Sequence, residues 1–332
     1  MGRRRPGTSV QRSMEKAEEE EEAEGELTAS QEQEAQRSYE ESLAQYYIYS
    51  LTRTFATGLR QLSTFSCSDC LSTVARLPAA HQSTPLSLSL IARAHYEVQD
   101  YRSSERAFKA LRWKERYRVW DMEVYSSLLW QMGREIELAF LAREMIDLAA
   151  GSGEAWIVVG NLFSVRKERE RALGCFRRAG ELAGKGSVKA YAYTLCGHES
   201  VDEDLGSAIR YFERALRVDG GRHYNAWYGL GTCYLRMGKV RMAEYHFRRA
   251  VGVNGGSAVL LGCVGLAVER RGEGGMLEAL GWFEKAVDVS EGRNALVRFR
   301  RAKIYVKLGL YEASELFYYY YSKLIDYINR KR

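Results

Sequence analysis

A block of about 34 residues recurs along most of this chain, and no other feature of the sequence restricts its fold as strongly. The clearest copy runs from residue 223 to residue 254. Its small and apolar residues fall three or four apart in two groups, as they do on one face of each of two helices. Gly238 lies between the groups and predicts the turn. The block is therefore a helix-turn-helix unit, and units of this kind stack on their neighbours into an all-helical array.

The packing residues of this unit recur at equivalent positions in its neighbours. Small residues let two helices cross closely, and large aromatic residues fill the space around the crossing. The residues in these positions are Trp156, Gly160, Ala172 and Phe176, then Gly197, Ala208 and Phe212, then Trp227, Gly231, Ala243 and Phe247, and finally Gly265 and Phe283. More divergent units lie at 58–77, 91–111, 125–146 and 302–318. The pattern is that of tetratricopeptide repeats, and it predicts an all-α, right-handed superhelix of about seven helix-turn-helix units.

Charge divides the chain unevenly. Residues 1–45 carry 6 Lys/Arg against 12 Asp/Glu, so the remainder of the 49 basic and 43 acidic residues, 43 and 31, leaves a basic body. The first segment has almost no large apolar residues, and we expect it to be a disordered acidic segment over 1–45. The superhelix is expected over 46–322 and a basic tail over 323–332. No apolar run is long enough for a membrane span or a secretory signal, which predicts an intracellular, reducing location.

The sequence carries no set of residues that indicates catalysis. No combination of nucleophile, base and orienting group stands out in the sequence. The glycine clusters do not match a phosphate-binding loop. Of six cysteines, only Cys67 and Cys70 lie close together, whereas a structural zinc site needs four ligands. We expect the cysteines to be small packed residues, and we expect no cofactor and no metal. The favoured interpretation is a non-enzymatic scaffold that binds other proteins.

Several strings extend beyond the bare repeat pattern. They are RAHYEVQDYRSSERAF at 93–108, ERYRVWDMEVYSSLLW at 115–130, EAWIVVGNLFS at 154–164, YAYTLCGHE at 191–199 and RHYNAWYGLG at 222–231. In order and spacing they resemble the carboxy-terminal superhelix of the cell-division-cycle 27 family, over roughly residues 46–317. The resemblance implies a non-catalytic scaffold subunit of the anaphase-promoting complex, a ubiquitin ligase of mitotic exit, located in the nucleus and cytoplasm. It also implies other subunits of that complex and coactivator proteins as partners.

In that family the inner groove of the superhelix captures the carboxy-terminal Ile-Arg tail of coactivators. Helical repeats present side chains of their first helices on such a concave surface. The groove candidates by repeat position are Asn161, His198, Asn225, Tyr228 and Thr232. Asn161 and Asn225 are expected to bond a peptide backbone, and Tyr228 to pack on an aliphatic side chain. The same side chains also suit solvation of the groove or packing between units.

Other interpretations stay open at this point. A chaperone-tail clamp would place a lysine where this chain has Ile157. An RNA-associated repeat is suggested by the basic body, but nucleic acid is disfavoured because the basic residues are spread over many helices. A regulatory fragment of an enzyme would have its catalytic domain elsewhere. The chain lacks the amino-terminal repeat half through which family members dimerise, so homodimerisation is left undecided.

Overall fold

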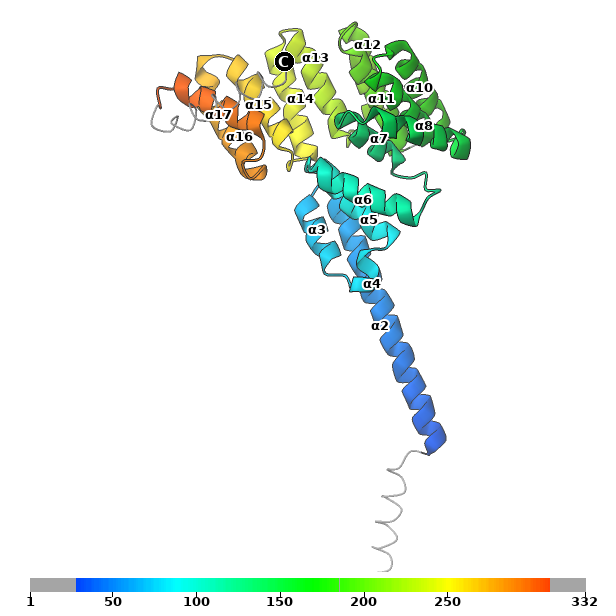
Figure 1. Cartoon of the computed structure of the whole chain (residues 1–332). Helices are drawn as coiled ribbons and strands as arrows, with labels where there is room; N and C mark the ends of the chain where they lie inside the picture. The colour runs from blue at the N-terminus through cyan, green and yellow to red at the C-terminus, as the bar shows by residue number, and fades with distance from the viewer. Residues whose placement is uncertain (1–27, 185, 311–332) are drawn as a thin grey trace, which may run out of the picture. The chain divides into compact units, whose positions relative to one another are not determined.

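The computed structural model describes residues 28–184 and 186–310. The chain divides into two units, residues 1–55 and 56–332, and each is described by itself. The second half of the repeat expected at 302–318 and the basic tail expected at 323–332 lie outside the described residues. Within the described residues every regular element is a helix, so the predicted all-α class is confirmed (Figure 1).

The helices follow one another with short connections. They are α2 (Ala29–Ser63), α3 (Cys67–Ala75), α4 (Ala79–Gln82), α5 (Pro85–Glu97), α6 (Tyr101–Lys114), α7 (Met122–Gln131), α8 (Glu135–Ala149), α9 (Gly153–Val165), α10 (Arg169–Leu182), α11 (Ser187–Ser200), α12 (Leu205–Val218), α13 (Tyr224–Arg236), α14 (Val240–Val253), α15 (Ala258–Arg270), η1 (Glu273–Gly275), α16 (Met276–Val289) and α17 (Ala295–Lys307). No helix among the residues described here has the length and apolar character that a membrane crossing requires.

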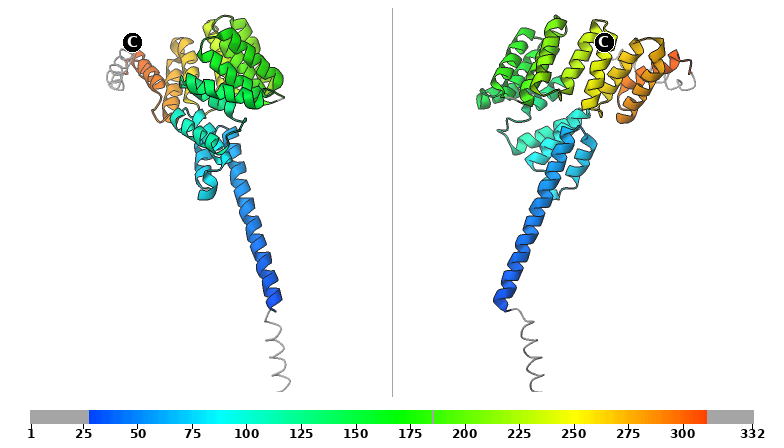
Figure 2. Two further views of the ribbon diagram at one scale, coloured as in Figure 1. Left: turned by 45° about the vertical axis from the view of Figure 1, so that its right-hand side comes forward. Right: turned by 180° about the vertical axis from the view of Figure 1, so that it is seen from behind.

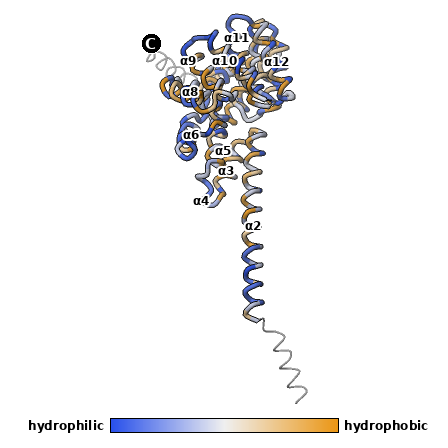
Figure 3. The backbone as a smooth tube through the Cα atoms, turned by 90° about the vertical axis from the view of Figure 1, so that its right-hand side faces the viewer, coloured by the Kyte–Doolittle hydropathy of each residue, from blue (hydrophilic) through white to orange (hydrophobic). Residues whose placement is uncertain are grey.

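In the first unit, residues 29–55 form the larger part of α2. This corrects the expected disorder up to residue 45, because α2 begins at Ala29. Figure 3 shows that the helix starts with a hydrophilic stretch. Its first two turns consist of Ala, Gln and Glu apart from Ser30, and these three are strong helix formers. Gln36 also donates a hydrogen bond to Glu40 one turn later at 2.8 Å. Local helix propensity therefore outweighs the shortage of apolar residues in this segment.

In the second unit, helices pack as successive neighbouring pairs (Figure 2). The pairs are α5 with α6, α7 with α8, α9 with α10, α11 with α12, α13 with α14, and α15 with α16. Each falls on a unit that the sequence predicts, including the divergent units at 91–111 and 125–146. Each second helix also packs on the first helix of the next pair, which makes a continuous stack. Stability in such a stack comes from contacts within and between neighbouring units.

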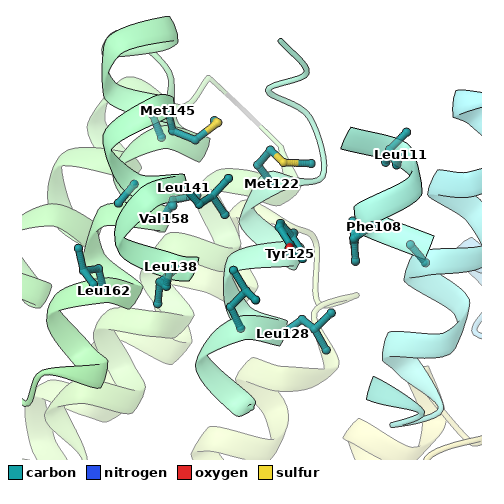
Figure 4. Packing of buried hydrophobic residues seen from close by; sticks show 14 of the residues in the cluster. Phe108, Leu111, Met122, Tyr125, Leu128, Leu138, Leu141, Met145, Val158 and Leu162 are labelled. Atoms are coloured by element: carbon teal, nitrogen blue, oxygen red, sulfur yellow. The ribbon is translucent and has the colours of Figure 1, made fainter. Parts of the chain in front are cut away.

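One large side chain occupies the same place in most pairs. The second helices α6, α10, α12, α14 and α16 each bury one phenylalanine, namely Phe108, Phe176, Phe212, Phe247 and Phe283. Figure 4 shows the core around the first of these, where α6, α7, α8 and α9 contribute leucine, methionine and valine side chains. The alanines that accompany these phenylalanines, Ala172, Ala208 and Ala243, are completely buried.

Glycine on the first helix makes room for these phenylalanines. A Cβ atom added at Gly160 would lie 2.3 Å from a ring carbon of Phe176, and one at Gly231 would lie 2.5 Å from the ring of Phe247. Real Cβ atoms do not approach other atoms this closely. Any larger residue at these positions therefore forces the two helices apart or turns the ring.

Two tryptophan side chains form hydrogen bonds to the turns that connect consecutive helix pairs. The indole nitrogen of Trp156 donates to the carbonyl of Ala150 at 2.8 Å, and that of Trp227 donates to the carbonyl of Gly221 at 2.8 Å. Both bonds tie the start of a first helix to the preceding connection. Each partly buried indole thereby satisfies its donor and fixes the angle between consecutive units.

Within residues 56–310 the stack curves enough to bring helices that are far apart in the sequence into contact. The hydroxyl of Tyr224 on α13 donates to the carboxylate of Glu97 on α5 at 2.6 Å, although 127 positions separate them. The ring of Phe65 packs edge-on against Tyr224 with centroids 5.0 Å apart. The first helix pairs of the second unit therefore lie beside α13, and the concave side of the stack is enclosed.

Replacing Gly160 with alanine tests the close crossing. We expect Gly160→Ala to lower the free energy of unfolding by about 1–3 kcal/mol, because the new methyl group overlaps the Phe176 ring. Urea denaturation followed by circular dichroism measures this. Gly174→Ala on the neighbouring α10 is the control, since its added Cβ meets nothing within 4 Å; it is expected to stabilise by about 0.5–1 kcal/mol. A Gly160→Ala midpoint at or above that of the parent protein would contradict the close crossing.

Candidate functional site

The first helices of five consecutive pairs line a cleft on the concave side of the stack. Its volume is about 690 Å³. Its walls come from α5, α7, α9, α11 and α13 and are formed by Tyr96, Ser127, Trp130, Gln131, Asn161, Ser164, Lys167, Arg169, Tyr191, Thr194, Leu195, His198, Glu199, Val201, Asp202, Asn225, Tyr228, Thr232 and Arg236. All five groove candidates from the sequence are among them. Repeat spacing places these residues together because first helices stand side by side.

Asn161 is committed to holding α9 against α7. Its side-chain amide donates to the hydroxyl of Ser126 at 2.8 Å and to that of Ser127 at 3.1 Å. The residue is 3% exposed. The Asn161 amide nitrogen is therefore used inside the protein, and its side-chain oxygen is the group that is left to bond a peptide backbone. Thr232 is similarly occupied, since its hydroxyl donates to the carbonyl of Tyr228 at 3.0 Å.

Asn225 and Tyr228 present open groups at the centre of the cleft. The Asn225 side chain forms no hydrogen bond with the residues that the structure describes, and it is half-buried. The Tyr228 ring lies between the rings of His198 and Phe247, with centroids 6.2 and 6.0 Å away. His198 is open to the cleft but surrounded by protein, and this burial lowers its pKa to about 4. The centre of the cleft is thus an aromatic floor with one unused amide and a neutral imidazole.

Cationic side chains gather at one end of the cleft. Arg236 donates to the carboxylate of Asp202 at 2.6 Å. The pKa of Asp202 is lowered by this bond and by the charges of Arg236, Arg169 and Lys167. Arg169 pairs with Glu203, yet its buried Nε–H has no partner among the described residues. Lys167, which forms the tight turn after α9, makes no ion pair within the described part of the chain. Unused N–H donors of this kind suit an anionic group.

The other end of the cleft is a buried hydroxyl network. The Tyr191 hydroxyl and the Ser127 hydroxyl lie 2.6 Å apart. Burial raises the pKa of Tyr191 to about 12 and also raises that of Tyr96. Both phenols therefore remain protonated at neutral pH and act as neutral hydrogen-bonding groups.

Lys167, Arg169 and Tyr191 were not identified from the sequence as residues of the cleft. Lys167 and Arg169 lie in and just after a turn, and repeat alignment weights helix faces instead of turns. Tyr191 lies on the first helix α11, about two turns before His198, so its repeat position was available as a signal. Ile157, where a chaperone-tail clamp would need a lysine, is completely buried on α9. That position does not face a ligand in this fold.

Comparison with known proteins identifies the class of protein and then the family. A family model described as "Tetratricopeptide repeat" matches residues 202–258. In fold, the chain is similar to a chain in the crystal structure of the APC/C hetero-tetramer Cut9-Hcn1, with a TM-score of 0.63 over 74% of this chain and 47% of that chain. Their sequences are 14% identical, so this likeness concerns the fold. The chain is a tetratricopeptide-repeat protein.

Sequence relatives narrow this class. The chain is 36% identical over 259 residues to Anaphase-promoting complex subunit 3 of Schizosaccharomyces pombe, covering 78% of this chain and 38% of that protein. It is 36% identical over 263 residues to Cell division cycle protein 27 homolog B of Arabidopsis thaliana, covering 79% of this chain and 34% of that protein. The chain belongs to the cell-division-cycle 27 family, also called anaphase-promoting complex subunit 3. It spans roughly a third of the length of these relatives.

The partly buried His223 is expected to make the stability depend on pH. Its pKa is lowered from 6.5 to about 4 by burial and by nearby His198. Between these pH values the unfolded chain binds more protons than the folded one, so stability is complete above pH 6.5 and is lost as pH falls towards 4. The free energy of unfolding therefore falls between pH 7 and pH 4.5. We expect this fall to be smaller in His223→Gln than in the parent protein by roughly 1–2 kcal/mol, as measured by urea denaturation at the two pH values. An unchanged pH dependence in the variant would show that His223 does not contribute.

Proposed function

We propose that this protein is a non-catalytic scaffold subunit of an anaphase-promoting complex, and that its cleft holds the carboxy-terminal tail of a coactivator. Membership of the family supports the first part. The unused donors of the cleft support the second. The partners are then other subunits of the complex and coactivator proteins, and the place of action is the nucleus and cytoplasm. We further propose that the superhelix extends over 46–322.

The single observation that carries the proposal is that the cleft keeps polar groups without internal partners. Asn225, Lys167 and the Nε–H of Arg169 all line it, and no described residue satisfies them. Buried or half-buried donors are normally satisfied, so donors left open in a concave site indicate a ligand. Asn225 and the Nε–H of Arg169 are donors of this kind, and the exposed Lys167 adds a positive charge to the same cleft.

An Ile-Arg tail matches the chemistry of these groups. Its terminal carboxylate suits Lys167 and the free Nε–H of Arg169, because charge-assisted hydrogen bonds to a carboxylate are strong. Asn225 suits the peptide backbone. The aliphatic isoleucine side chain suits the Tyr228 ring, because the face of this ring is apolar and half-buried. Short peptides bind repeat proteins in this way, with the backbone held by side-chain amides and anchored at its end.

Purification of the tagged protein from its own cells tests the scaffold role. Mass spectrometry is expected to find sister tetratricopeptide-repeat subunits together with a cullin-like and a RING-like subunit. Chaperones or ribonucleoproteins in their place would contradict the proposed complex while leaving the fold unaffected.

Titration with a fluorescein-labelled peptide that ends in Ile-Arg tests the cleft. We expect an amidated copy of the peptide to bind at least about tenfold more weakly than the free acid, because it loses charge-assisted bonds of roughly 1.5–3 kcal/mol. Lys167→Ala and Asn225→Ala are expected to weaken the free acid similarly and to change the amidated copy less.

Lys239→Ala is the matched control for Lys167→Ala. Lys239 follows the turn between α13 and α14, it is exposed, and it does not line the cleft. Its variant should bind both peptides like the parent protein. Equal affinity for the acid and the amide, or an equal loss in the control, would contradict tail capture in this cleft.

A further inference from the structure

A surface outside the cleft carries strongly exposed aromatic side chains. Trp113 at the end of α6 is 90% exposed, Tyr117 is 76% exposed and Trp120 is 71% exposed. All three lie on the eight-residue stretch 113–120, here called the aromatic loop, and none lines the cleft. Tryptophan is highly buried on average in folded proteins, and it is enriched at protein interfaces, where it dominates binding energy.

The aromatic loop is held in one conformation from beneath. Asp121 is buried and has a left-handed backbone, with φ of 69°. Its carboxylate accepts hydrogen bonds from Ser89 at 2.6 Å, Arg93 at 3.2 Å and Arg118 at 2.8 Å. A buried carboxylate with three donors fixes the backbone that follows α6 and precedes α7.

Arg118 links the buried Asp121 carboxylate to the exposed Trp120. Its guanidinium also donates to Glu115 at 2.6 Å and to the carbonyl of Trp120 at 3.2 Å, and it lies 5.9 Å from the centre of the Trp120 ring. The tryptophan is therefore positioned by a cation–π contact and a backbone bond. A loop that is ordered before binding loses less conformational entropy when a partner arrives.

The charges of the loop are unequally used. Its acids are neutralised internally, Glu115 by Arg118 and Asp121 by Arg93 and Arg118. Lys114 and Arg116 are exposed and form no ion pair within the residues described. Two cations without an ion pair thus lie between Trp113 and Tyr117 in the loop. The complementary partner is anionic and carries apolar side chains.

We propose that the aromatic loop is a docking surface for an extended acidic segment of another protein, in which carboxylates meet Lys114 and Arg116 and an apolar side chain packs on Trp113 and Trp120. A protein segment fits better than nucleic acid, because single-stranded nucleic acid binds along grooves with many cations and the loop offers two. This surface is independent of tail capture in the cleft.

Binding of a defined acidic peptide tests the docking surface. The probe is fluorescein-labelled EELEEFEE with an amidated end, and its neutral counterpart is QQLQQFQQ. Amidation keeps carboxylate capture in the cleft out of the measurement. With the full chain at low salt, fluorescence anisotropy is expected to show binding of the acidic probe at least tenfold tighter than binding of the neutral one.

Two loop variants and two controls locate the binding. Lys114→Glu combined with Arg116→Glu, and Trp113→Ala combined with Trp120→Ala, should each weaken the acidic probe at least tenfold. Lys239→Glu combined with Arg241→Glu carries the same change with the same spacing on another exposed turn, and Phe140→Ala removes a 72% exposed ring on α8. Both controls should bind like the parent protein. All changes are at exposed side chains, so circular dichroism melting curves should coincide.

Three results would overturn the proposal. The first is equal affinity for the acidic and neutral probes, and the second is an equal loss in the loop and control variants. The third is tight binding of labelled oligothymidylate that the loop variants abolish while the acidic peptide does not bind, which would make the loop a nucleic-acid surface.

Discussion

The contact between a glycine on one helix and a phenylalanine ring on the next sets the packing of the four helix pairs from α9 with α10 to α15 with α16. At Gly160 and Gly231 the ring occupies the space that a side chain would take. In these four pairs the two helices therefore cross closely and have nearly the same shape. Because the shape repeats, the first helices α9, α11 and α13 stand side by side on the concave side. They supply most of the residues that line the cleft.

Internal hydrogen bonding decides which groups of the cleft are available. The Asn161 amide is used to hold α9 to α7, whereas Asn225, two pairs further along, has no described partner. The aromatic loop shows the same division among its charged groups. Glu115 and the adjacent Asp121 form ion pairs with Arg118, whereas Lys114 and Arg116 form no ion pair with the described residues. In both places the structure uses one set of polar groups for order and leaves another for partners.

Much of the fold was predictable because repeats are local. The spacing of Gly, Ala and aromatic residues predicted the helix pairs, and the five groove candidates do line one cleft. The segment from Ala29 was predicted wrongly as disordered, since the argument weighed buried area and underrated helix propensity. The hydrogen bonds that Asn161 donates were not predicted, because their acceptors Ser126 and Ser127 belong to the preceding repeat, 35 and 34 positions away.

The sequence by itself determined the repeating unit, the residues that pack within it and the family to which the chain belongs. These depend on neighbours within about 34 positions and on an apolar pattern that any reader of the sequence can follow. Tertiary structure decided the rest: the bond between Glu97 and Tyr224, the open donors of Lys167 and Arg169, and the exposure of Trp113 and Trp120. The bond between Glu97 and Tyr224 joins two distant repeats and depends on the curvature that accumulates as pairs stack. The open donors and the exposed rings depend on which neighbouring groups lie within reach, and the repeat pattern alone does not contain this information.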